Sequence, residues 1–264
     1  MGKKDLVEVF KDTHRKYLTD FVEDTHELIT SGTYLYDEPI SDFHIMPHRK
    51  MPNKDMVVGV VSGGTVEIGH TLIHPDKRTA ILNFADALKP GGLLLVGATT
   101  QEENICRCSN LYASLTSEDA KKYYDDNRAY KSFVYTDDII YSRDVAFFKD
   151  DKEYEDVDKY YMDVITCPAP SVHLDDSIEE SVIYNRVEKI IKVAALNKVD
   201  NLVLGAWGCG AFSQNPEVVS KAFAEAVKKY PAFDSVIYAV RVTTENPMDD
   251  ANYRAFWNNC NKEV

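Results

Sequence analysis

The chain has 264 residues, of which 44% are hydrophobic and 28% charged, and its formal net charge is −13. This composition is typical of a globular protein with one large α/β domain or two small ones, and it excludes a membrane span, since no apolar run approaches the roughly 20 residues that a span requires. The polar, charged start lacks the apolar core of a signal peptide, and the five cysteines suit a reducing compartment better than a disulfide framework, so we expect a cytoplasmic protein.

Helical periodicity marks the beginning of the chain. Apolar side chains recur at spacings of three and four over the first 30 residues, as the buried face of a helix requires. Three prolines, Pro39, Pro47 and Pro52, then interrupt residues 37–54, which predicts an extended crossing into the core. We therefore interpret 1–54 as a helical accessory segment. Because the chain has no internal repeat and no Pro/Gly/Ser linker, we expect a single domain over residues 1–264.

Beyond this segment, strand-like and helical patterns alternate, which predicts an α/β fold with a layered sheet. The expected strands are 56–61, 80–85, 162–168, 201–206 and 235–240. One helix is indicated by an apolar stripe at Ile183, Val187, Ile190, Ile191 and Ala194.

Another helix is indicated by Asn215-Pro216-Glu217, an N-cap residue followed by a proline and an acidic residue in the first turn. The glycine-bearing loop 208–212 is expected between the strand 201–206 and this helix. In open α/β sheets, ligands bind at such a position.

The stretch 81–103 carries the strongest functional signal. An apolar strand ending at Phe84 is followed by Pro90-Gly91-Gly92 and then by Gln101-Glu102-Glu103 at the start of a helical pattern. Glycines allow the backbone to approach a phosphate closely, and adjacent carboxylates supply acid and base chemistry. The stretch is typical of a site that holds a nucleotide diphosphate and acts on the sugar beside it.

These residues resemble the signature of poly(ADP-ribose) glycohydrolases, a triple-glycine loop followed by Gln-Glu-Glu, and the bacterial-type branch fits best. The resemblance continues in the same order through residues 141–145, 164–170 and 204–212. It implies a macrodomain-like mixed sheet sandwiched by helices, with an N-terminal helical extension. The implied activity is hydrolysis of the glycosidic bond of ADP-ribose adducts, either the terminal unit of poly(ADP-ribose) or a mono-ADP-ribosylated acceptor. No cofactor and no metal are implied.

The resemblance also implies roles for individual residues. Glu103 would be the general acid and base, and Glu102 would hold the ribose hydroxyls. The helix dipole would lower the pKa of Glu103, whereas burial and the charge of Glu102 would raise it, and the sequence leaves that balance open. Phe212 would close over the distal ribose. The remaining expected ligand-binding residues are Asn83, Asp86, Gly91, Gly92, Gln101, Gly208, Cys209, Gly210 and Ala211.

The sequence departs from the family pattern at three positions of the loop. Leu93 stands where the third glycine is expected, Lys89 stands where an Asn commonly precedes the proline, and Asp86 adds a carboxylate near the two glutamates. If Leu93 had to take a positive φ or to face the diphosphate, its β-carbon would lower the affinity for the ligand. We expect instead that the first two glycines form the turn and that Leu93 packs inward with Leu95.

Other motifs carry less information. Cys106 and Cys108 are too close for a zinc half-site, and Pro47 lies between His44 and His48, so a metal is not expected. Residues 150–156 predict a solvated hairpin or loop. One tyrosine at most, among Tyr123, Tyr124, Tyr130 and Tyr135, is expected to stack an adenine.

The net charge of −13 affects which substrates and binding partners the protein attracts. Polyanions gain little long-range attraction from an acidic protein, which favours ADP-ribose on a protein or at a polymer end over a grip on long polymer. ADP-ribosylated nucleic acid is another conceivable partner, but no basic, aromatic-interleaved stripe supports it. The alternative function is a catalytically weak ADP-ribose reader, since Leu93 and Asp86 depart from the enzyme pattern.

Overall fold

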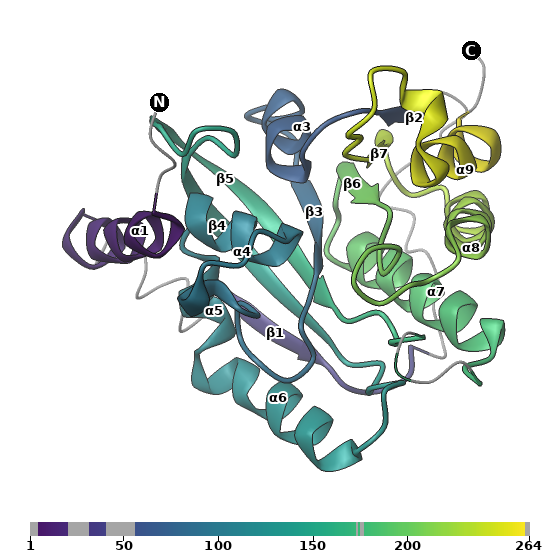
Figure 1. Ribbon diagram of the computed structural model, residues 1–264, viewed down its shortest axis with the longest axis horizontal. Coiled ribbons are helices and arrows are strands. Elements are labelled where there is room, and N and C mark those ends of the chain that lie inside the picture. Colours follow the sequence, from purple (N-terminus) through teal and green to yellow (C-terminus); the bar gives the residue numbers. More distant parts are fainter. Residues whose placement is uncertain (1–4, 21–31, 41–55, 173, 175–176, 262–264) are drawn as a thin grey trace.

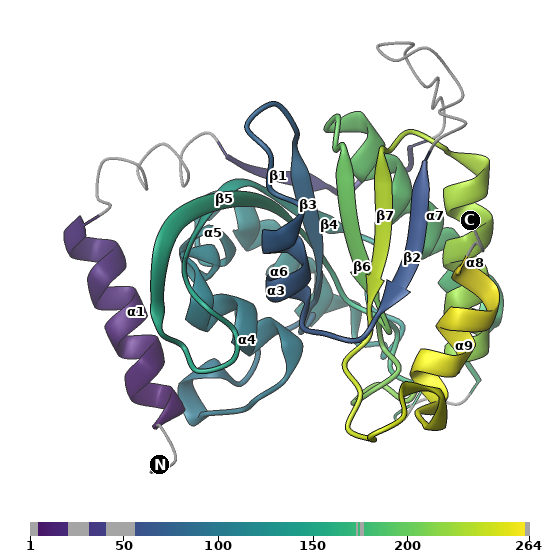
Figure 2. The same cartoon turned by 90° about the horizontal axis from the view of Figure 1, so that it is seen from above.

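The computed structural model describes residues 5–20, 32–40, 56–172, 174 and 177–261. Its centre is a seven-stranded mixed sheet in the order β1-β4-β5-β3-β6-β7-β2 (Figures 1 and 2). The strands are β1 Thr33–Tyr36, β2 Val57–Val61, β3 Thr79–Phe84, β4 Ile139–Lys149, β5 Asp156–Cys167, β6 Asn201–Gly205 and β7 Ser235–Ala239. The pairs β1/β4 and β4/β5 are antiparallel, and all other neighbours are parallel.

Helices cover both faces of the sheet. On one face lie α1 Leu6–Asp20, α3 Thr65–Thr71, the short turn η1 Leu94–Val96, α4 Gln101–Cys108, α5 Leu111–Leu115 and α6 Glu118–Tyr130. On the other face lie α7 Glu180–Leu196, α8 Pro216–Lys229, η2 Pro247–Asp249 and α9 Ala251–Cys260 (Figure 2). Within the described ranges, no helix has the length and apolar character needed to cross a bilayer.

The two hydrophobic cores follow from the alternation of side chains along each strand. In β3, Ile81 faces the core under α4 and Leu82 faces the core under α7, and both are fully buried. Because the parallel strands are covered on both faces, they carry nearly continuous apolar runs. This is the pattern from which the sheet was predicted, and the α/β layered architecture is confirmed.

Five predicted strands occur as β2, β3, β5, β6 and β7, and the helices beginning at Gln101 and Pro216 start where the sequence indicated. The predicted stripe on α7 is buried in full. Asn215 caps α8 by accepting a hydrogen bond from the N–H of Glu217 at 3.0 Å. Local signals of periodicity and capping were sufficient for these elements.

Two strands were not predicted. β1 lies inside the segment 1–54 that we interpreted as helical, and it extends the sheet at its edge by pairing with β4. β4 was not predicted because three polar residues, Ser142, Arg143 and Asp144, interrupt its apolar pattern. These residues mark a register shift, and Asp144 has a φ of 53°. A β-bulge accounts for this polar interruption.

The helix α1 confirms the predicted N-terminal periodicity as far as Asp20, and the rest of the predicted helix lies outside the described residues. Its Thr13 hydroxyl donates to the carbonyl of Arg107 in α4 at 2.7 Å. The buried guanidinium of Arg107 in turn donates to the carbonyls of Leu6 and Ala98. α1 is therefore joined to the loop that precedes α4.

Candidate active site

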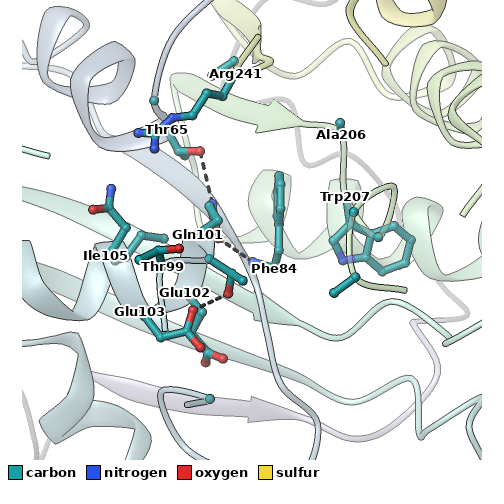
Figure 3. Close-up of a pocket in the computed structure, with 18 of the residues that line it drawn as sticks. Thr65, Phe84, Thr99, Gln101, Glu102, Glu103, Ile105, Ala206, Trp207 and Arg241 are labelled. Atoms are coloured by element: carbon teal, nitrogen blue, oxygen red, sulfur yellow. Dashed lines mark hydrogen bonds between the residues drawn. The ribbon is translucent and has the colours of Figure 1, made fainter. Parts of the chain in front are cut away.

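A cavity of about 480 Å³ opens at the carboxyl ends of β2, β3, β6 and β7 (Figure 3). Its walls come from the loops that follow these strands and from the beginning of α4. Glu102 and Glu103 lie on one wall, Trp207 lies on the opposite wall, and Phe84 stands between them (Figure 3). This volume suits a small organic ligand, and parallel sheets bind ligands at this edge.

The cavity exists because β3 and β6 separate near their ends. β6 pairs with β3 only as far as Ile81, whereas β5 follows β3 to Phe84. Gln101 compensates for the missing strand partner, because its side chain accepts from the N–H of Phe84 at 2.8 Å and donates to the carbonyl of Leu82 at 2.7 Å. A further bond joins it to the Thr65 hydroxyl at 3.1 Å (Figure 3). Gln101 therefore fixes the start of α4 to the end of β3.

Glu102 is held in a buried position beneath the cavity, with 2% of its surface exposed. Its carboxylate accepts hydrogen bonds from Asn83 Nδ2 at 3.2 Å and from the N–H of Asp86 at 2.8 Å. Burial raises the pKa of Glu102 to about 8, and the charges of Asp86 and Glu103 act in the same direction. Asp86 is thus part of the electrostatics of the site, as its position in the sequence suggested.

The raised pKa of Glu102 predicts a pH dependence of stability. The folded state binds this proton more tightly than the unfolded state, whose glutamate has the ordinary pKa of 4.5. The resulting stabilisation is complete below pH 4.5 and is lost as the pH rises towards 8. In urea unfolding from about pH 5 to about pH 8, we expect wild type to lose up to about 1.4 kcal/mol per pH unit relative to Glu102→Gln. Parallel curves for the two proteins would contradict the raised pKa.

Glu103 is buried to a similar degree, with 3% of its surface exposed. One carboxylate oxygen accepts from the N–H of Leu93 at 2.9 Å, and the other accepts from the hydroxyl of Thr100. Both groups belong to the segment that runs from the glycine loop into α4. The loop therefore positions Glu103 through two donors.

Gly92 makes this arrangement possible. Its φ is +60°, and a Cβ there would lie 2.6 Å from Glu103 Oε1 and 3.2 Å from Glu102 Oε2. The two carboxylates consequently approach the same point of the loop. Gly91 also has a positive φ, but its α-carbon faces the ring of Tyr112 and the residue does not line the cavity. Of the two glycines, only Gly92 contacts the glutamates.

The expectation that Leu93 packs inward with Leu95 is wrong. Leu93 has a φ of −99°, which a leucine adopts without strain, and 48% of its surface is exposed at the edge of the cavity. Leu95 is 61% exposed. The three-residue turn η1 directs these side chains away from the core, because Leu94 alone is buried in it. Lys89 is also exposed, and its N–H donates to Asp86 Oδ1 at 3.0 Å.

The opposite wall is the predicted loop 208–212 between β6 and α8. Gly208 has a φ of +75° and packs so closely that a Cβ would lie 2.6 Å from the Cβ of Ala169. Gly210 faces open space, and it lines the cavity together with Ala211 and Phe212. Within the described part of the chain, the N–H groups of residues 210–212 donate to no other backbone or side-chain group. The three residues that carry these N–H groups line the cavity.

Two other expected ligand-binding residues do not line the cavity. Asn83 is fully buried behind Glu102, where its amide also donates to the Thr166 hydroxyl at 3.2 Å. Cys209 is not among the residues that line the cavity, and burial raises the pKa of its thiol to about 12. The geometry gives Asn83 a means of orienting Glu102, and it gives the Cys209 side chain no contact with the cavity.

None of the four tyrosines considered for adenine stacking lines the cavity. Tyr123 and Tyr124 are buried in the core beneath α6, and Tyr130 and Tyr135 border a separate cavity. The stacking expectation is therefore not supported by their positions. The aromatic side chains of the cavity are those of Phe84, Trp207 and Phe212.

Sequence reasoning missed a third glycine-bearing loop, Gly63-Gly64, which follows β2 and lines the cavity. A Cβ at Gly64 would collide with Asp151 Oδ2. Asp151 belongs to the acidic turn between β4 and β5, which is a hairpin as expected, but this carboxylate is buried and not solvated. Arg241, 3.8 Å from Asp151, also lines the cavity. A glycine pair at a predicted strand end was the signal available for this loop.

No cluster of three or more histidine, cysteine or acidic side chains suited to a metal ion occurs among the residues that are described. His44 and His48 lie outside those residues. All five cysteines are unpaired.

Comparisons with known proteins agree with this geometry. The sequence model for the microbial-type poly(ADP-ribose) glycohydrolase catalytic domain matches residues 10–150. The structure of the poly(ADP-ribose) glycohydrolase from Deinococcus radiodurans in complex with ADP-ribose is 33% identical, with a TM-score of 0.72 over 78% of this chain and 84% of that one. The enzyme from Thermomonospora curvata is 25% identical, with a TM-score of 0.82 over 97% and 100%. The complex of a poly(ADP-ribose) glycohydrolase from the same organism with the inhibitor ADP-HPD is 26% identical in sequence. Its TM-score is 0.80 over 96% of this chain and 98% of that one. No protein with curated annotation matches.

Proposed function

Because this chain belongs to the microbial-type poly(ADP-ribose) glycohydrolase family, we propose that it is a glycosidase that hydrolyses ADP-ribose adducts and releases ADP-ribose. The observation that carries this conclusion is the pair of buried glutamates held against Gly92 at the wall of the cavity. The bond cleaved joins the anomeric carbon of the terminal ribose to the acceptor. The acceptor is the rest of a poly(ADP-ribose) chain or a modified protein.

Glu103 acts as the general acid and then as the general base. Its protonated carboxyl donates to the leaving oxygen or nitrogen while the glycosidic bond breaks, and the resulting carboxylate removes a proton from the water that attacks the sugar. The N–H of Leu93 and the hydroxyl of Thr100 both donate to this carboxyl group. They stabilise the anion that forms as the proton leaves, which lowers the barrier more than it strengthens substrate binding.

Glu102 holds the ribose hydroxyls. Its raised pKa of about 8 means that the carboxyl is largely protonated at neutral pH, so it both donates and accepts hydrogen bonds. The amide of Asn83 and the N–H of Asp86 orient it from below. Phe212, on the facing wall, closes over the same ribose.

The pyrophosphate of the substrate binds to the loop 208–212. The N–H groups of Gly210, Ala211 and Phe212 are available as donors, and consecutive backbone N–H groups are a common anion site. Gly210 faces open space, so no side chain obstructs the phosphates. The pyrophosphate charge lies on the opposite wall from the glutamates, where it stabilises the cationic sugar in the transition state.

The whole chain 1–264 acts as one catalytic domain, with residues 1–54 as its accessory segment. Two contacts support this proposal. β1 extends the central sheet, and α1 is hydrogen-bonded to Arg107 near the end of α4, the helix that begins with Gln101 and the two glutamates. A cytoplasmic location is supported by the five unpaired thiols.

ADP-ribose binding is the first expected result. Free ADP-ribose should raise the melting temperature in proportion to the logarithm of its concentration, because the cavity exists only in the folded state. At about 100 times the dissociation constant, the stabilisation should reach about 2.7 kcal/mol. AMP, which lacks the distal ribose, should stabilise less. The absence of both a thermal shift and a calorimetric heat at saturation would contradict the enzyme and reader functions together.

The activity is tested by measuring released ADP-ribose from poly(ADP-ribose), from a mono-ADP-ribosylated protein and from ADP-ribosylated DNA. We expect release from the polymer end or the modified protein. Release from DNA alone would identify a different acceptor class. Binding without release from any of the three would support the reader function.

A further inference from the structure

The shape of the loop 208–212 depends on the two residues that follow it. The N–H of Ser213 donates to the carbonyl of Gly210 at 3.0 Å, and the N–H of Gln214 donates to the carbonyl of Gly208 at 3.0 Å. Gly208 and Ser213 both have positive φ angles, of 75° and 57°. A positive φ is unfavourable for a serine, and it persists only where the surroundings hold the backbone. The loop is therefore a fixed turn that Gln214 closes.

The Gln214 side chain anchors this turn to another part of the chain. It is buried, with 6% of its surface exposed, and its Nε2 donates to the carbonyl of Pro170 at 2.7 Å. A Cβ at Gly208 would lie 2.7 Å from Gln214 Cγ and 2.6 Å from the Cβ of Ala169. Gly208 is thus enclosed between the Gln214 side chain and the segment 167–170. Gln214 does not line the cavity, so its effect on a ligand passes through the loop.

The segment 167–170 joins this loop to the wall that carries the glutamates. The carbonyl of Cys167 accepts from the indole N–H of Trp207 at 2.9 Å and from the N–H of Ala85 at 3.4 Å. Ala85 directly follows β3, and Trp207 stands on the opposite wall (Figure 3). The two walls, which are far apart in the sequence, share one acceptor. Because Gln214 attaches the loop to the same segment, this segment sets the spacing between the loop and the glutamates.

Resting on the proposed hydrolase function, we propose that Gln214 is a positioning residue for the pyrophosphate of the substrate. Its hydrogen bond to Pro170 fixes the N–H groups of residues 210–212 in the orientation in which they bind both phosphates. Preorganised donors stabilise an anion more than donors that must first be ordered. A misplacement of about 1 Å lowers a reaction rate by about a hundredfold, so the same hydrogen bond keeps the distal ribose in register with Glu103.

The test compares ADP with AMP, which differ only in the second phosphate, by calorimetric titration. Wild type should bind ADP at least about tenfold more tightly than AMP, the effect of one charge-assisted hydrogen bond. Gln214→Met keeps the length of the side chain and its packing on Gly208 but cannot donate to Pro170. It should bring the ADP-to-AMP ratio of affinities close to one, and its kcat/KM on poly(ADP-ribose) should fall in parallel with its affinity for ADP.

Asn201→Leu is the matched control. Asn201 lies at the other end of β6, where its amide donates to the carbonyl of Leu72 at 3.1 Å, and it does not line the cavity. This variant loses a comparable hydrogen bond, so its stability in urea should fall while its ADP-to-AMP ratio stays at the wild-type value. If Gln214→Met does not fold, Gln214→Asn, which withdraws the amide from Pro170, should show the same loss of ratio.

Equal affinity of wild type for ADP and AMP would overturn the inference, because the loop would then not bind a pyrophosphate. A wild-type ratio in the Gln214 variants would remove Gln214 from the positioning of the loop. A similar loss of ratio in Asn201→Leu would mean that lower stability alone is responsible. Failure of wild type to release ADP-ribose from any acceptor, with its ADP-to-AMP ratio as expected, would contradict the proposed function and not the role of Gln214.

Discussion

Replacing Glu103 with glutamine should nearly abolish ADP-ribose release while leaving the affinity for free ADP-ribose within about tenfold, or roughly 1.4 kcal/mol. The amide keeps the size of the side chain and can still accept from the N–H of Leu93 or the hydroxyl of Thr100. It cannot donate a carboxyl proton or activate water. Because that proton transfer contributes mainly in the transition state, the loss should appear in kcat.

The measurement is a single-turnover assay together with calorimetric titration of ADP-ribose. Glu67→Gln is a suitable control, because Glu67 lies on α3, pairs with Lys152 at 2.7 Å and does not line the cavity. Full activity in Glu103→Gln would remove Glu103 from the mechanism. If wild type and variant bind equally and neither releases ADP-ribose from any acceptor, the protein is a reader.

Replacing Gly92 with alanine should lower kcat/KM by about a hundredfold, which is the effect of a displacement of about 1 Å in catalytic groups. Two costs combine at this position. The φ of +60° disfavours any residue with a Cβ, and that Cβ would lie 2.6 Å from Glu103 Oε1. The loop must move away from the glutamates, and Glu103 then loses the donor at Leu93.

Gly97→Ala separates backbone strain from displacement of the glutamates. Gly97 belongs to the same loop and has a φ of +80°, but the atom nearest to a Cβ at this position would be Val7 Cγ2 at an ordinary 3.5 Å. Both variants should lose free energy of unfolding in urea because of backbone strain, and Gly92→Ala should lose more because its Cβ also overlaps Glu103. Only Gly92→Ala should lose most of its activity. Equal activity losses in the two variants would show that strain alone is responsible.

Local patterns in the sequence were enough for much of the fold and for the centre of the site. The strand before Phe84, the helix start at Gln101 and the cap at Asn215 are all encoded within a few residues. They were predicted because periodicity and capping act over one or two turns of chain. The edge strand β1 and the bulged strand β4 were not predicted, because their stability depends on pairing with each other and with β5.

The sequence by itself determined the α/β class, the family resemblance and the two glutamates with their glycine loop. The tertiary structure decided which residues actually meet. Gln101 contacts the backbone of β3 because β6 has separated from it, and Gly64 contacts the buried Asp151, which belongs to the distant hairpin between β4 and β5. Leu93 was expected inside and is exposed, because burial depends on the direction of a turn in space. The hydrophobic pattern of a sequence indicates which side chains can be buried. Only the packed structure determines which of them are buried.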